Sequence, residues 1–215
     1  MSLRLYHYVH CPFCVRVRMS LGYLNLPYES TVLAYDDEAT PIKLTGKKIL
    51  PILAHAQGNM DESLDIIAFV DKANKLKVKE TIQSSSFIKI EELLKDVGNL
   101  VHSLAMPYWI YTPEFSESSR TYFQKKKEEK RGLFTDLIRN QSTFISELKP
   151  HLESLEQNLK PFYRSSSFSF QDILIASHLW GLYVVPEFQF SENLHHYLQK
   201  IKQTCKFNYH QDFWS

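Results

Sequence analysis

The first 75 residues alternate between strand-like and helix-like patterns of hydrophobic and polar positions. Short apolar or aromatic runs bounded by turn residues predict strands at residues 4–8, 28–33 and 49–54, followed by a hairpin turn at 57–59. Apolar positions spaced three and four apart predict helices over residues 12–24, 39–44 and 63–75. The order β-α-β-α-β-β-α predicts a small mixed sheet flanked by helices.

The rest of the chain has helical spacing throughout. Two stripes of buried positions are expected, one at Phe87, Ile90, Leu94, Val97, Val101 and Leu104 and the other at Leu148, Leu152, Leu155 and Leu159. The prolines of Met106-Pro107 and Thr112-Pro113 predict breaks in the chain between these stripes. Ser169 and Asp172 precede the apolar run 173–182 with the spacing of a capping box, so a further helix is expected there.

The change from a mixed to a purely helical pattern divides the chain into two predicted domains. We expect a sheet-containing domain over residues 1–75, a linker over 76–84 and an all-helical domain over 85–215. The predicted fold class is α+β. Within the helical part, the mixed-charge run 125–131 predicts a solvated helix face.

The composition is that of a globular protein, and it argues against several functional classes. Of the 215 residues, 44% are hydrophobic and 23% are charged, which argues against disorder. A formal net charge of +1 provides no basic field that would attract nucleic acid or an anionic membrane. No apolar run approaches the roughly 20 residues of a membrane span, and no secretory signal precedes the first cysteine. We therefore expect a cytoplasmic protein.

The most informative chemistry lies in Cys11-Pro12-Phe13-Cys14, at the junction of a predicted strand and helix. Pro12 suits the first helical position, and the free N–H groups at the helix start favour a thiolate on Cys11. Positive potential is also expected from basic residues that are near in sequence or in the likely fold, namely Arg16, Arg18, Lys48 and His10. Cys14 lies one turn further into the helix, so it is expected to be less exposed and to resolve a mixed disulfide formed on Cys11.

Metal or haem binding by the cysteine pair has weaker support in the sequence. A structural zinc site needs about four ligands, and no second Cys-x-x-Cys or His-x-x-x-His is present, so no metal is expected. A c-type haem site needs histidine after the second cysteine, where Val15 stands. Two buried structural cysteines remain an alternative. Cys205 is interpreted as an incidental thiol, and His195-His196 as a solvated helix face.

Two further elements suggest a binding site for glutathione. A cis bond before Pro51 would turn the backbone N–H and C=O of Leu50 toward an extended thiol peptide, although an ordinary trans edge proline is the alternative. Ser63 is expected to cap the helix that follows Glu62, and the donors exposed there suit the γ-glutamyl carboxylate, although a plain helix cap without a ligand is the alternative. Combined with Cys11, these elements describe a site for the tripeptide.

The chain resembles the glutaredoxin and glutathione-transferase superfamily, and within it the large two-domain bacterial glutaredoxins. The resemblance spans nearly the whole chain, in segments at residues 10–14, 46–53 and 62–66, at Tyr122-Phe123 with Lys125-Lys126-Lys127, and at Asp172-Ile173. It implies a thioredoxin-like N-terminal domain and an all-α, glutathione-transferase-like C-terminal domain. The family usually has tyrosine where Phe13 stands, a change expected to alter substrate docking more than chemistry.

The resemblance also implies which residues hold glutathione and what the protein does. It implies a cis Pro51, contacts to glutathione from Leu50, Glu62 and Ser63, and a contact from Lys48 to the glycine carboxylate. It implies a glutathione-dependent thiol–disulfide oxidoreductase whose co-substrate is glutathione and whose partners are glutathionylated or disulfide-bonded proteins. We expect a monomer that binds neither nucleic acid nor membranes.

Two rival functions share these features. A glutathione transferase or dehydroascorbate reductase using Cys11 would have the same fold, but such relatives commonly lack the inner cysteine, so Cys14 favours the oxidoreductase. A non-enzymatic transferase-like binding module is the second rival. A glutathione titration without binding would favour that module.

Overall fold

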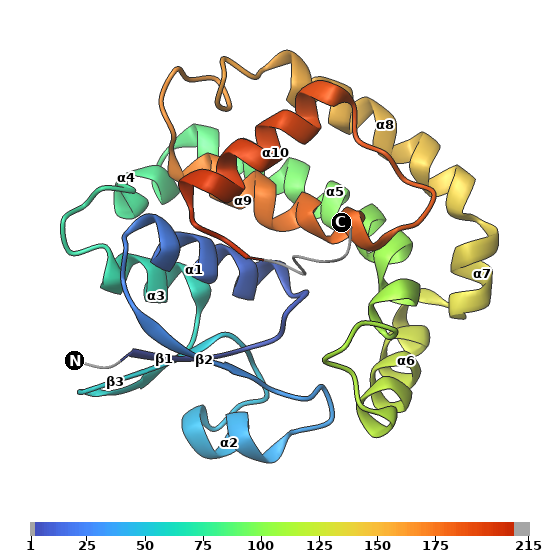
Figure 1. Ribbon diagram of the computed structural model, residues 1–215, viewed down its shortest axis with the longest axis horizontal. Coiled ribbons are helices and arrows are strands. Elements are labelled where there is room, and N and C mark those ends of the chain that lie inside the picture. Colours follow the sequence, from blue (N-terminus) through green and yellow to red (C-terminus); the bar gives the residue numbers. More distant parts are fainter. Residues whose placement is uncertain (1–2, 209–215) are drawn as a thin grey trace.

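The computed structural model describes residues 3–208 as a four-stranded sheet and a larger helical assembly (Figure 1). The strands are β1 (Leu3–His7), β2 (Tyr28–Val32), β3 (Ile52–His55) and β4 (Gly58–Met60). The helices between and just after them are α1 (Pro12–Tyr23), α2 (Ala39–Thr45) and α3 (Ser63–Val70). This order confirms the predicted β-α-β-α-β-β-α arrangement. Residues 1–2 of the predicted first domain and residues 209–215 of the predicted second domain lie outside the described residues.

The register of the sheet gathers four chain segments at one end of it. The strand order is β2-β1-β3-β4, with β1 parallel to β2 and antiparallel to β3. Tyr6 near the end of β1 pairs with Ile52 at the start of β3, and Leu53 pairs with Met60 at the end of β4. The segments that follow β1, β2 and β4 and the segment that precedes β3 therefore meet at the same sheet end, which we call the gathered end of the sheet. Helices α1 and α3 lie on one face of the sheet, and α2 lies on the other (Figure 1).

Helices make up the second part of the chain. They are α4 (Val78–Ile82), α5 (Ser85–Trp109), α6 (Glu117–Arg131), α7 (Phe134–Arg139), α8 (Gln141–Gln157), α9 (Phe170–Leu179), a 3₁₀ turn at Trp180–Val184, and α10 (Glu192–Thr204). The apolar stripe of α5 is buried from Ile90 through Leu104, and Leu148 through Leu155 are buried in α8. A mixed sheet with its own helices, followed by an all-helical part, agrees with the predicted α+β class.

Three expectations about helix limits are corrected by the structure. Helix α3 ends at Val70 rather than near residue 75, because the Asp71 carboxylate accepts the N–H groups of Lys75 and Leu76 at 2.8 Å and organises a separate turn. Helix α5 continues through Pro107 to Trp109. Pro107 is buried, and α5 ends only two residues after it. Ser63 is the first residue of α3, and Glu62 occupies the cap position assigned to Ser63.

The stretch expected to link the two domains is packed rather than open. It contains α4, and Leu76 and Val78 are buried in the hydrophobic core that both parts of the chain share. The boundary at residues 76–84 therefore stays a prediction.

Helix α1 packs closely against the C-terminal segment. A Cβ atom on Gly22 would lie 1.8 Å from the Cys205 carbonyl oxygen, so only glycine allows this approach. Cys205 follows α10 directly and is fully buried, which makes its thiol part of the core. Arg18 donates to the Asn208 carbonyl at 2.7 Å, and its guanidinium lies over the Phe207 ring. These contacts fix α1, and with it the cysteine pair, to the helical part.

Asp172 accepts several hydrogen bonds at the start of α9, and its loss should destabilise the fold. Its buried carboxylate accepts hydrogen bonds from the Ser169 and Tyr163 N–H groups at 2.8 Å and from the Tyr197 hydroxyl at 2.9 Å. The Ser169 bond confirms that part of the predicted capping box. We expect Asp172→Ala to lower the free energy of unfolding by about 2–4 kcal/mol, because buried donors lose their acceptor.

Urea unfolding monitored by circular dichroism measures this change. The exposed Asp136, which pairs with Arg139 at 2.9 Å, provides the matched control, and Asp136→Ala should cost less than about 1 kcal/mol. Equal midpoints for the two variants would contradict the role of Asp172.

Candidate active site

The cysteine pair lies at the start of α1, where the chain leaves β1 at the gathered end of the sheet. Cys11 precedes the helix in an extended conformation, and Pro12 begins the helix. The Cys11 carbonyl accepts the Val15 N–H at 2.9 Å, which fixes the first turn. Cys11 is half-buried, whereas Cys14 is completely buried. The expected difference in exposure between the two sulfur atoms is confirmed.

The Cys11 thiol is acidified by its surroundings. A hydrogen bond from the Cys14 side chain contributes most, and with the backbone N–H groups of Cys14 and Phe13 it lowers the pKa of Cys11 to about 7. Burial opposes this shift, and the positive charge of Arg16 supports it. A substantial fraction of Cys11 is therefore thiolate at neutral pH, as expected for a cysteine at a helix start.

Cys14 has the opposite tendency. Burial raises the pKa of its thiol well above the ordinary value, and the neighbouring Cys11 sulfur raises it further. The Tyr8 N–H points at the Cys14 sulfur at 3.4 Å. Cys14 thus remains a protonated thiol that donates to Cys11, which suits an inner, resolving position.

Two cations contribute to the field around Cys11 from different parts of the fold. The guanidinium of Arg16 is buried and lies 4.5 Å from the centre of the Phe13 ring. Lys127 of α6 is half-buried with its ammonium 5.3 Å from the Phe123 ring centre. Burial lowers the pKa of Lys127, and attraction to Cys11 opposes this shift only in part. The helical part therefore adds positive charge that the sequence did not predict. The mixed-charge run of α6 is otherwise mostly exposed.

His10 connects the loop that carries Cys11 to the helical part. Its Nε2 atom lies 2.8 Å from the Thr112 hydroxyl and forms an ion-pair contact with Glu114, while its ring stacks on Trp109 with centroids 5.1 Å apart. The Thr112 hydroxyl already donates to the Trp109 carbonyl at 2.6 Å, so Nε2 must carry a proton and act as the donor. His10, the residue directly before Cys11, is therefore anchored to the helical part. This role adds to the positive potential expected of it.

The segment before β3 lies against the cysteine pair. The Leu50–Pro51 peptide bond is cis, as the resemblance implied. Leu50 belongs to a small apolar cluster with Cys14, Leu33 and Ile52, against which Cys11 packs. The structure therefore brings Leu50 and the two cysteines together.

The start of α3 completes the gathered end of the sheet. Glu62 follows β4, is exposed and has a positive φ of 65°, while Ser63 is 7% exposed. The N–H groups in the first turn of a helix have no acceptor within the helix, so they offer donors for an anion. The charge of Asp61 is partly balanced by Lys47 at 3.5 Å.

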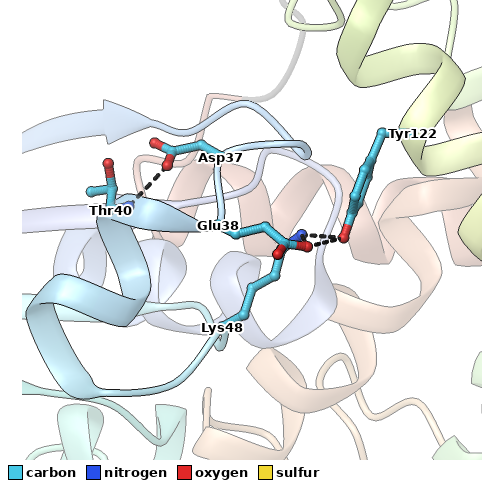
Figure 2. A network of polar contacts seen from close by, with 5 residues as sticks. All are labelled: Asp37, Glu38, Thr40, Lys48 and Tyr122. Carbon is cyan, nitrogen blue, oxygen red and sulfur yellow. Dashed lines mark hydrogen bonds and ion pairs between the residues drawn. The ribbon is translucent and has the colours of Figure 1, made fainter.

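Lys48 lies two residues before Leu50 and takes part in a polar network that spans both parts of the chain (Figure 2). Its ammonium donates to the Glu38 carboxylate at 2.9 Å and to the Tyr122 hydroxyl at 2.5 Å. The Tyr122 hydroxyl donates to the same Glu38 oxygen at 2.5 Å. Lys48 is thus held by a residue of α6.

Phe13 borders a groove outside this cluster. Its side chain is 47% exposed and faces His178 edge-on, with ring centres 6.3 Å apart. The groove has a volume of about 550 Å³, and Ile88, Glu91, Glu92 and Lys95 of α5 form its far side. Phe13 therefore presents an apolar surface beside the reactive sulfur.

Comparison with known proteins identifies the family. A family model described as Glutaredoxin 2, C terminal domain, matches residues 89–213, and a Glutathione S-transferase N-terminal domain model matches residues 5–77. Glutaredoxin 2 of Escherichia coli K12 is 32% identical over 211 residues, which cover 96% of this chain and 97% of that protein. The chain belongs to the glutaredoxin 2 family.

Solved structures agree with this assignment. Glutaredoxin 2 of Salmonella typhimurium, crystallised in complex with glutathione, superimposes with a TM-score of 0.84 at 30% identity and 96% coverage of both chains. A glutathione S-transferase of Ceriporiopsis subvermispora has a TM-score of 0.74 at 14% identity, covering 95% of this chain and 96% of that one. The second likeness shows a shared fold.

Membership of the glutaredoxin 2 family makes the chain a glutathione-dependent thiol–disulfide oxidoreductase, with glutathione as its co-substrate. Among the helices of residues 3–208, none combines the length and hydrophobicity of a membrane span. Within the same range, no group of three or more His, Cys, Asp or Glu side chains is placed to hold a metal ion.

Proposed function

We propose that this glutaredoxin reduces mixed disulfides between glutathione and proteins with Cys11 as its nucleophile. The proposal rests on one observation: at one end of the sheet, an acidified, half-exposed Cys11 meets the segment 50–51 before β3 and the start of α3. This arrangement offers a nucleophile, an extended backbone and a set of anion-binding donors at one place.

Each part of glutathione has a proposed partner at this end of the sheet. The backbone of Leu50 beside Pro51 pairs with the cysteinyl residue, and Glu62 and Ser63 receive the γ-glutamyl group at the start of α3. Lys48 lies beyond Leu50 and meets the glycine carboxylate. The glutathione complex of the Salmonella relative supports the assignment of this ligand.

The proposed reaction consists of two displacements at sulfur. The Cys11 thiolate attacks the glutathione sulfur of the mixed disulfide, so that a Cys11–glutathione bond forms and the protein thiolate leaves and takes up a proton. A glutathione thiolate then attacks the glutathione sulfur bound to Cys11. Oxidised glutathione leaves, and the Cys11 thiolate is restored.

Protein disulfides require the second cysteine. Cys11 first forms a mixed disulfide with one protein sulfur and releases the other. The Cys14 thiol then loses its proton and attacks Cys11, which releases the second protein thiol and closes a Cys11–Cys14 disulfide. Two molecules of glutathione reduce this bond. Phe13 is proposed to contact the protein half of such substrates, because it is exposed beside Cys11.

Further parts of the proposal concern partners and location. We expect a cytoplasmic monomer acting on glutathionylated or disulfide-bonded proteins, with no nucleic-acid or membrane partner. The low number of cysteines suits a reducing compartment. Gel filtration with light scattering tests the monomer.

One comparison of activities tests the proposed function. Purified protein is assayed for reduction of hydroxyethyl disulfide and of a glutathionylated peptide by glutathione, and for conjugation of glutathione to an aromatic electrophile. We expect rapid turnover of both disulfides and little conjugation. Conjugation without disulfide reduction would favour the transferase, and absence of glutathione binding would favour the non-enzymatic module.

The acidity of Cys11 predicts a particular pH dependence. Only the thiolate is alkylated, and its fraction rises with pH through the pKa of about 7. The alkylation rate by iodoacetamide should therefore increase about tenfold between pH 6 and pH 8 and level off above that range. Measuring this rate in the Cys205→Ala protein restricts the signal to the active-site pair. A midpoint near 8.5 or above would contradict an acidified Cys11.

A further inference from the structure

The network of Lys48, Glu38 and Tyr122 joins the proposed glycine end of the glutathione site to the helical part of the chain (Figure 2). Glu38 precedes α2, Lys48 follows it, and Tyr122 lies 84 positions from Glu38, on α6. Asp37 accepts the Thr40 N–H at 2.9 Å, which fixes the turn that carries Glu38. The three side chains form a closed triangle.

Counting donors and acceptors defines the direction of every bond in this triangle. An ammonium group has three donors and no acceptor, so Lys48 donates to both Glu38 and Tyr122. The Tyr122 hydroxyl accepts a hydrogen bond from Lys48 and donates its single proton in a hydrogen bond to Glu38. The Lys48 ammonium also lies 4.0 Å from the centre of the Tyr122 ring. One N–H of Lys48 is left over after these two bonds.

The surroundings of Tyr122 hold the phenol in place. The next residue, Phe123, is buried and packs against Tyr35 with ring centres 4.6 Å apart. Tyr35 stacks in turn on Tyr8, which precedes the catalytic cysteine, with ring centres 4.0 Å apart. Helix α6 is therefore fixed against the segment that carries Glu38, and the phenol reaches Lys48 from a packed position.

We propose that Tyr122 is a positioning residue for glutathione, which together with Glu38 orients the Lys48 ammonium toward the glycine carboxylate. This inference rests on the proposed function, in which Lys48 meets that carboxylate. A free lysine side chain samples many rotamers, and restricting them before binding reduces the entropy lost when the ligand arrives. Lys48 is only 26% exposed and is accessible beside the half-exposed Glu38, so a carboxylate can reach it.

A distinction between charge and orientation follows from this arrangement. Glu38 and Lys48 carry opposite charges, so the network attracts an anion only weakly at a distance. Its contribution comes from the direction of the remaining N–H group. Removing the Tyr122 hydroxyl should consequently weaken recognition of the glycine carboxylate without altering the sulfur chemistry at Cys11.

The experiment compares Tyr122→Phe with the wild-type full-length protein on two substrates. One is a glutathionylated peptide, and the other is the same peptide with the glycine carboxylate of its glutathione esterified. We expect Tyr122→Phe to raise KM for the first substrate about 3- to 10-fold with kcat within about twofold, the effect of losing one charge-assisted hydrogen bond. For the ester, the two proteins should have equal KM values.

A double-mutant cycle and a matched control complete the test. If Tyr122 acts through Lys48, Tyr122→Phe should have no further effect in a Lys48→Ala background. Tyr111→Phe removes another tyrosine hydroxyl from the helical part, at a side chain that is 71% exposed, and should leave all constants unchanged. An unchanged KM in Tyr122→Phe, an equal loss on both substrates, or additive effects with Lys48→Ala would overturn the proposal. Turnover of the glutathionylated peptide by the wild type tests the proposed function separately.

Discussion

Replacing Cys11 by serine is expected to reduce turnover of hydroxyethyl disulfide and of a glutathionylated peptide by at least about 1000-fold. A serine hydroxyl does not ionise near neutral pH, so the surroundings that lower the pKa of Cys11 to about 7 have no anion to stabilise. The side chains differ in one atom, and Cys11 is only half-buried, so the fold should be retained. The glutathione-coupled assay measures the loss, and circular dichroism monitors the fold.

Cys205→Ala is the matched control for the loss at Cys11. Cys205 is buried at the end of α10, outside the gathered end of the sheet, and its removal should leave turnover within about twofold. Substantial activity in Cys11→Ser, or a comparable loss in Cys205→Ala, would contradict the assignment of the nucleophile.

Replacing Cys14 by serine should separate the two reactions. Reduction of a protein disulfide should fall by about 100-fold or more, because no second thiol remains to displace the protein from Cys11. Removal of glutathione from a glutathionylated peptide should remain within a few-fold of wild type, since its second step uses free glutathione. Serine keeps an O–H group where Cys14 has its S–H, so a donor to Cys11 remains and the pKa of Cys11 should stay at about 7.

The comparison requires both substrates at one pH. Assays at pH 8 and above, where most of Cys11 is ionised, make the comparison insensitive to any difference in the pKa of Cys11 between the two proteins. Equal losses on the two substrates at that pH would show that Cys14 is needed for both reactions and would contradict a purely resolving role.

Sequence patterns predicted most of the elements because their signals are local. The Cys-Pro-Phe-Cys motif itself indicates a strand-to-helix junction, since proline fits the first helical position and cysteine the position before it. The long apolar stripe of α5 similarly identified a single buried face. The interruption predicted at Pro107 was wrong, because α5 includes this buried proline and ends two residues later, at Trp109.

The features that sequence analysis missed depend on how distant segments dock. Lys127 was placed on a solvated helix face, yet the packing of α6 against the aromatic residues near Cys11 makes it half-buried. The contacts of His10 with Thr112 and Glu114 join residues about a hundred positions apart. No periodicity or spacing in the sequence encodes such pairs. Conversely, the cis bond at Pro51 was implied by resemblance, where the residue pattern alone left the trans form open.

The helical part thus contacts the sheet end that carries Cys11 in three ways. It anchors His10, the residue before Cys11, adds the positive charge of Lys127 and brings the Tyr122 hydroxyl to Lys48. Each contact links a residue beside the proposed glutathione site to α5, α6 or the loop between them. We infer that the sheet with its own helices would be a weaker catalyst without these supports.

The most direct test of the central claim is to trap the proposed intermediate. The Cys14→Ser protein is incubated with oxidised glutathione, quenched with acid, and digested for mass spectrometry. Our account predicts the mass of one glutathione on the peptide that contains Cys11, and its release by added glutathione. Glutathione bound at Cys205 instead, or no adduct under conditions where the wild type turns over, would contradict it.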